Sequence, residues 1–214
     1  MKTRITFCLL ACAMLLTGCV TGTRDIELAS PEYQSTKRME GLVYIGNIED
    51  QRHFEAKPRN PSTPSVKGNL HSTSKDKLAT LIGRQRNGFG KAMGDVTLPA
   101  GMTVQEEMRE LLTKGLESRG YTVTDDETAP VKLEVDIDKF WAWFSPGMWA
   151  VSFEANLACG LNVTTENGER ELKVVGYGMN KGQIASDANW QLAYHRAFSD
   201  FLENLDNALD KAKL

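Results

Sequence analysis

The side chains that could do acid–base, nucleophilic or metal chemistry are scattered along this sequence. Asp136 and Asp138 lie two residues apart on a predicted strand, about 7 Å from each other, a separation that paired catalytic carboxylates can have. The same alternation fits a solvated strand face, which we favour. His53, His71 and His195 lack the spacing of metal ligands, and no Gly-x-Ser-x-Gly nucleophile signature occurs. We therefore expect no catalytic residue, no metal and no cofactor.

One cysteine has a sequence context that suggests a modification. Two basic residues precede an apolar run at 5–17, and Gly18 stands just before Cys19. This pattern is typical of an export signal, and the run is shorter than the about 20 residues that span a bilayer. The residues Leu-Thr-Gly-Cys at 16–19 resemble the lipobox of bacterial lipoproteins, whose cysteine is lipidated and becomes the mature N-terminus. The resemblance implies a signal peptide at 1–18 and a lipid on Cys19; the alternative is an ordinary secretory signal.

The residues after Cys19 bear on where the protein is located. Val20 stands where an aspartate would favour the inner membrane in such lipoproteins, so the resemblance implies lipid anchoring at the periplasmic face of the outer membrane. Residues 19–39 are polar and without clear periodicity, which predicts a flexible tether with a typical span of roughly 25 Å.

Composition indicates one globular domain at 40–214. The chain has 214 residues, 41% of them hydrophobic and 25% charged, with a net charge of −3. Such a charge disfavours a nucleic-acid partner. Once Cys8 and Cys12 leave with the signal and Cys19 takes the lipid, Cys159 alone remains, so no internal disulfide is expected. Its alternating apolar surroundings predict a buried thiol.

The first half of the domain mixes short elements with a long loop. A strand is predicted at 41–46, followed by a loop at 47–76 that contains three prolines, with Asp50 and Arg52 bracing its start. A second strand is predicted at 77–84, and the glycine-rich stretch 84–91 favours a hairpin turn over a phosphate loop.

Two amphipathic helices and three long strands define the rest. Thr103 and Glu106 form a capping box for a helix that ends at Gly120, with Glu107 on its polar side, and a final helix spans 186–212. Strict alternation predicts antiparallel strands over 131–138, 149–163 and 172–179. We therefore expect an α+β two-layer domain: a mixed, largely antiparallel sheet with two main helices on one face.

The alternation stops after Lys139, where aromatic residues occupy both faces of the hairpin end. In one interpretation the loop at 47–76 or the helix ends cover the second face. In the other, an exposed aromatic tip contacts a partner protein or a membrane interface, where tryptophan is favoured. The candidate contact residues are Trp141, Trp143, Phe144 and Trp149.

Several features together resemble the YajG-type family of outer-membrane lipoproteins. They are the lipobox, a first strand followed by Asp50-Gln51-Arg52, a helix ending in Arg-Gly-Tyr-Thr-Val at 119–123, long alternating strands and a C-terminal helix. The resemblance covers most of residues 40–210 and implies an envelope lipoprotein rather than a reaction.

Three functions fit these observations. The leading one is a lipid-anchored, non-catalytic binding or assembly factor of the cell envelope, with the membrane as its partner and an envelope protein as a second candidate partner. The others are an accessory subunit of a secretion or surface-appendage machine and, less favoured, an envelope hydrolase.

Overall fold

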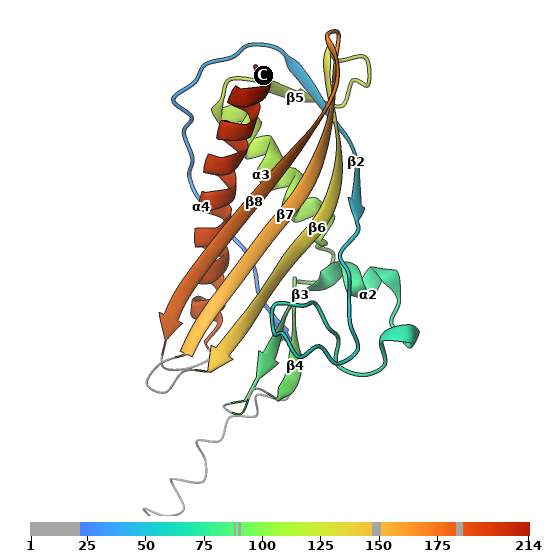
Figure 1. Cartoon of the computed structure of the whole chain (residues 1–214), viewed down its shortest axis with the longest axis vertical. Coiled ribbons are helices and arrows are strands. Elements are labelled where there is room, and N and C mark those ends of the chain that lie inside the picture. Colours follow the sequence, from blue (N-terminus) through green and yellow to red (C-terminus); the bar gives the residue numbers. More distant parts are fainter. Residues whose placement is uncertain (1–21, 88, 90, 147–150, 183–185) are drawn as a thin grey trace, which may run out of the picture.

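The computed structural model describes residues 22–87, 89, 91–146, 151–182 and 186–214. Its centre is a long three-stranded antiparallel meander of β6 (Val131–Pro146), β7 (Val151–Thr165) and β8 (Gly168–Gly182) (Figure 1). The inward face of β7 alternates without a break, because every second residue from Phe153 to Val163 is buried. The predicted meander and the α+β class are confirmed.

A β-bulge explains why the alternation of β6 stops. The pairing of β6 with β7 shifts between Ile137 and Lys139, so one extra residue reverses which side chains face the helices. Before the bulge the odd-numbered residues enter the main core, and after it the even-numbered ones do. The aromatic residues beyond the bulge are therefore divided between the two faces of the sheet.

On its other side β6 has two successive partners, so the sheet forks. β2 (Leu42–Asp50) runs parallel to the first half of β6 and also pairs with β5 (Thr122–Thr124). β3 (Leu81–Arg86) runs parallel to the second half, at Ala142 and Trp143. β3 then forms the predicted hairpin with β4 (Ala92–Thr97), which pairs with β1 (Arg24–Asp25). The long pairings are antiparallel, whereas the short ones around the fork are mostly parallel.

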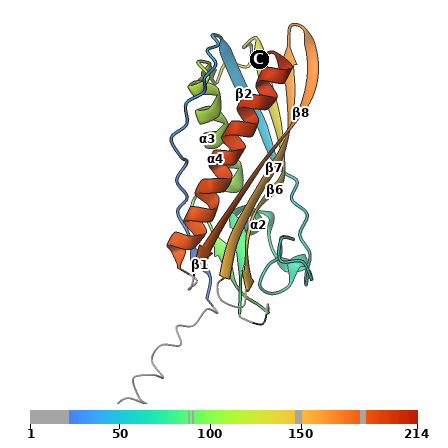
Figure 2. The same cartoon turned by 60° about the vertical axis from the view of Figure 1, so that its left-hand side comes forward.

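Within the described residues, three α-helices accompany the sheet. α4 (Asp187–Ala212) packs along β7 and β8, and α3 (Val104–Ser118) packs against β2, β5 and α4 (Figures 1 and 2). The capping box of α3 is present. The third is α2 (Lys75–Thr80), preceded by a short 3-10 turn at Leu70–Ser72. The strand predicted at 77–84 is therefore wrong over 77–80, because Ser74 caps a helix turn there and the strand begins at Leu81.

Helix α4 also protects the free edge of β8. Three side chains of α4 at four-residue spacing bond the unpaired backbone of this edge: Asn204 to the carbonyl of Val175, Asp200 to the N–H of Tyr177, and Arg196 to the carbonyl of Met179. Occupied edge groups cannot pair with a strand of another molecule. The helix comes this close because β8 has glycines at 176 and 178.

The predicted flexible tether at 19–39 is wrong for its described part, because residues 22–39 lie against the domain. Ile26 is buried, and its N–H donates to the carbonyl of Thr97. Ser35 is buried and bonds Asp206 at 2.8 Å. Figure 2 shows this segment running beside α3 and α4. The segment is attached by hydrogen bonds and apolar contacts at irregular intervals. Such contacts leave no periodic pattern in the sequence, which is why residues 22–39 resemble a flexible tether there.

Replacing Gly178 with alanine should destabilise the protein by about 2–3 kcal/mol, because the new Cβ would lie 2.2 Å from the carbonyl oxygen of Ala193 and force α4 away. Chemical denaturation measures the loss. The control is Gly160→Ala on β7, whose Cβ would meet only Asp136 at 4.0 Å. Equal stability of the two variants would contradict this packing.

Candidate functional site

Arg52 lies at the fork of the sheet, just after β2 ends. Its guanidinium donates to both carboxylate oxygens of Asp50, at 2.7 and 2.8 Å. The remaining N–H groups donate to three backbone carbonyls around the fork, those of Leu81 (2.6 Å), Phe140 (2.9 Å) and Leu78 (2.8 Å). Leu78 lies in α2, and its carbonyl also accepts the backbone N–H of Leu81. All five N–H groups of this arginine are therefore used. The expected bracing role of Asp50 and Arg52 is confirmed.

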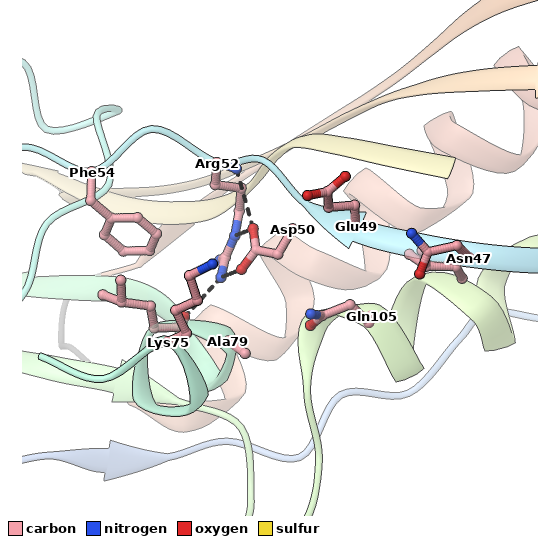
Figure 3. Close-up of a pocket in the computed structure, with 10 residues that line it drawn as sticks. Asn47, Glu49, Asp50, Arg52, Phe54, Lys75, Ala79 and Gln105 are labelled. Atoms are coloured by element: carbon pink, nitrogen blue, oxygen red, sulfur yellow. Dashed lines mark hydrogen bonds and ion pairs between the residues drawn. The ribbon is translucent and has the colours of Figure 1, made fainter. Parts of the chain in front are cut away.

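A polar cavity of about 470 Å³ opens beside this cluster (Figure 3). Glu49 and Asp50 line it from β2, Lys75 from α2, and Gln105 from the start of α3. Among the lining residues, Arg52 is the one buried cation. The central carbon of its guanidinium lies 5.2 Å from the centroid of the Phe54 ring. Because this guanidinium has no N–H group left to give to a ligand, the cluster serves the fold rather than recognition.

The aromatic residues beyond the bulge are buried. Trp141 is fully buried, and Trp143 and Phe144 are each 7% exposed. Trp141 packs edge-on against Phe54, and its indole N–H donates to the carbonyl of Pro61, so the loop after β2 covers this face of the sheet. The exposed-tip interpretation is therefore wrong for these three residues. Trp149 lies outside the described residues, as does Cys19.

The other candidate residues remain apart from one another. His53, His71 and His195 are exposed and far from forming a ligand set: in the described part of the chain no group of three His, Cys, Asp or Glu could hold a metal ion. Asp136 accepts hydrogen bonds from Gln51 and Asn162, while Asp138 lies at the bulge.

The single thiol of the described domain is buried, as expected. Cys159 is 1% exposed, and burial, with a smaller contribution from the charge of Asp138, raises the pKa of its thiol to about 12. A thiol with so high a pKa is a poor nucleophile at neutral pH.

Glu107 lies in a different environment from the one its helical pattern predicts. Glu107 was expected on the polar side of its helix, but it is only 5% exposed. Its spacing of three from Val104 and four from Leu111, both buried, could have indicated this. Burial, then the charges of the neighbouring acids Glu110, Glu106 and Glu27, raises the pKa of Glu107 to about 7. No nucleophile or base among the described residues is hydrogen-bonded to it.

Arg52→Met should lower the free energy of unfolding by about 3–5 kcal/mol, because it removes the guanidinium that pairs with the carboxylate of Asp50 and donates to the carbonyls of Leu81 and Phe140. Urea denaturation measures the change. Arg59→Met, in the same loop but exposed, removes the same charge and should cost less than about 0.5 kcal/mol. A similar small effect for both variants would contradict this bracing role of Arg52.

Glu107 should make stability fall as pH rises. Its pKa is higher in the folded chain (about 7) than its ordinary value of 4.5, so the folded state binds more protons between these values and loses stability across that window. Glu107→Gln should abolish this slope and add about 3 kcal/mol at pH 8, with little change below pH 4. Denaturation at several pH values tests this. The exposed helix residue change Glu117→Gln should keep the slope.

Comparison with known proteins gives a family match and two distant structural similarities. A family model described as "Uncharacterized lipoprotein" matches residues 84–207. No curated protein matches the chain. Among solved structures, protein XCC0632 from Xanthomonas campestris, assigned to family DUF330, is 9% identical with a TM-score of 0.47, covering 89% of this chain and 98% of its own. An uncharacterised protein is 11% identical with a TM-score of 0.41, covering 87% and 97%. Neither similarity carries an inference about this chain.

The family match extends from β3 through most of α4 and so includes the meander and both long helices. Among the described residues no helix is both long and apolar enough to cross a membrane. Because the match covers more than half of the sequence, the chain belongs to the YajG-type family of uncharacterised lipoproteins.

Proposed function

We propose that this lipoprotein is anchored through a lipid on Cys19 to the periplasmic face of the outer membrane, where it acts as a non-catalytic binding or assembly factor. The family, the export signal and the lipobox-like residues before Cys19 support the anchor, and Val20 supports the outer membrane. Two acyl signals make such anchoring stable.

The position of Gly22 carries the proposal further. The carbonyl of Gly22 accepts a hydrogen bond from the side chain of Gln85 on β3 at 2.9 Å. Three residues, which span at most about 11 Å, connect Gly22 to Cys19. A lipid on Cys19 would therefore hold the domain by its β3–β4 end, close to the bilayer and in one orientation.

Side chains at that end suit a membrane surface. Phe89, in the turn between β3 and β4, is 98% exposed, and the neighbouring Lys91 is exposed as well. β6 ends and β7 begins on the same side of the molecule as the β3–β4 hairpin (Figure 1), and Trp149 stands in the sequence between these two strands. Aromatic rings and lysines are favoured at the membrane interface. We accordingly keep Trp149 as a proposed membrane contact.

The anchor is tested by palmitate labelling in cells. Cys19→Ala should abolish incorporation and release the domain from the membrane fraction, because the acceptor thiol is lost. Cys159→Ala is the matched control, since it removes the other cysteine of the mature chain, and should label normally. Labelling that persists in Cys19→Ala would refute the anchor.

Orientation is tested by fluorescence quenching in liposomes. The lipidated protein, with Cys159 replaced by serine, receives a fluorophore through Phe89→Cys or through Glu166→Cys at the opposite end of the meander. Lipids bearing quenchers should quench the probe at 89 several-fold more than the probe at 166. Equal quenching would mean that the domain has no fixed orientation.

A further inference from the structure

A second cavity, of about 420 Å³, lies between the loop after β2 and the β3–β4 hairpin, and its charge is one-sided. Arg84 and Arg86 line it from β3, and Lys57 and Lys91 are exposed at its rim. None of the described residues that line it is acidic. We call it the basic cavity; its volume is within the range of small-molecule sites, about 300–1,000 Å³.

Arg84 is buried there without the partners that a buried guanidinium needs. It is 6% exposed, and within the described chain its one hydrogen bond runs from Nη1 to Asp95 at 3.0 Å, while Nε has no partner. Asp95 also accepts the backbone N–H of Lys67. Arg52, buried to the same degree, uses all five N–H groups. Underused buried donors are costly, so a site that keeps them suggests a missing acceptor.

Two other residues that line the basic cavity, Ser65 and Arg86, also indicate that it binds an acceptor. Ser65 lines the basic cavity, is 2% exposed, and its hydroxyl has no hydrogen-bond partner among the described residues. Arg84 and Arg86 alternate with Gln85 along β3. Burial lowers the pKa of Arg86, and the nearby charge of Arg84 lowers it further. An anion between these cations would relieve both penalties, that of burial and that of repulsion.

We propose that the basic cavity binds a phosphate group, with Arg84 and Ser65 at its floor and the two lysines at its rim. Arginine N–H groups and a hydroxyl match phosphate oxygens, and the cations outnumber Asp95, which suits a doubly charged anion. The phosphate is that of a membrane lipid. That the phosphate comes from a lipid rests on the proposed anchoring at Cys19. Gln85, which stands between the two arginines on β3, donates a hydrogen bond to the carbonyl of Gly22, so the basic cavity lies at the end of the domain that the anchor would hold near the bilayer.

The test measures the rise in melting temperature of the purified full-length lipidated protein in a non-ionic detergent. It is titrated with inorganic phosphate and, separately, with a short-chain phosphatidic acid. Both should stabilise the protein, and the phospholipid should do so at about ten-fold lower concentration. If inorganic phosphate acts at equal or lower concentration, the site is an anion site but the lipid source is wrong.

The variants that test the site must leave the fold intact. Arg84→Met is unsuitable, because it would leave Asp95 buried without its ion pair. Ser65→Ala instead removes an unbonded buried hydroxyl, so it should raise the melting temperature without ligand and yet reduce the shift that phosphate causes. Lys57→Ala with Lys91→Ala should weaken binding about ten-fold or more. The control, Lys173→Ala with Lys211→Ala, removes the same charge from exposed positions elsewhere and should bind normally.

The proposal is overturned if neither ligand stabilises the protein, or if the Ser65 and rim-lysine variants respond like the control. This outcome is independent of the labelling at Cys19, since binding by the purified chain is measured directly. If the chain with Cys19 unchanged takes up no palmitate, or if labelling persists in Cys19→Ala, while the purified chain still binds phosphate, the anchor and the lipid source are wrong but the anion site remains.

Discussion

The structure depends on a single guanidinium at the fork of the sheet. β6 changes partner from β2 to β3 along its length, and such a change leaves carbonyl groups without a neighbouring strand. Arg52 supplies the missing donors from one side chain and neutralises its charge with Asp50. The loop that follows Arg52 is thereby directed back over β6, where it covers Trp141. One side chain thus couples the sheet topology to the closure of its second face.

A second buried arginine, Arg119, joins the N-terminal segment to α4 at the end of the molecule opposite the β3–β4 hairpin. Arg119, buried at the end of α3, donates to Asp206 and Asp210 of α4 and to the carbonyl of Leu214, while its own carbonyl accepts from Met39. The segment from 22 to 39 is consequently fixed along the helices and ends against the β3–β4 hairpin. A lipid at Cys19 would then set the orientation of the domain as well as its location.

Two buried arginines in the same half of the molecule differ in how fully they are bonded. Arg52 is saturated by backbone and carboxylate, as expected for a structural charge. Within the described part of the chain, Arg84 has a single side-chain hydrogen bond and lines a cavity whose charged lining residues are all cationic. Burial is similar, so exposure does not distinguish a structural arginine from a recognition arginine. What distinguishes them is the number of guanidinium N–H groups that have an acceptor within the protein.

Local patterns determined much of this fold. The alternation of β7, the capping box at Thr103, the glycine that ends α3 and the stripe of α4 depend on neighbours within a few residues, and all were readable. The extra residue at the bulge of β6 could not be predicted from the sequence, because its effect appears only in the register with β7. The cover over Trp141, the docking of residues 22–39, the burial of Glu107 and the underbonded Arg84 join segments far apart in the chain. Only tertiary packing decided them, since no local pattern records which distant carbonyl, ring or carboxylate a side chain will meet.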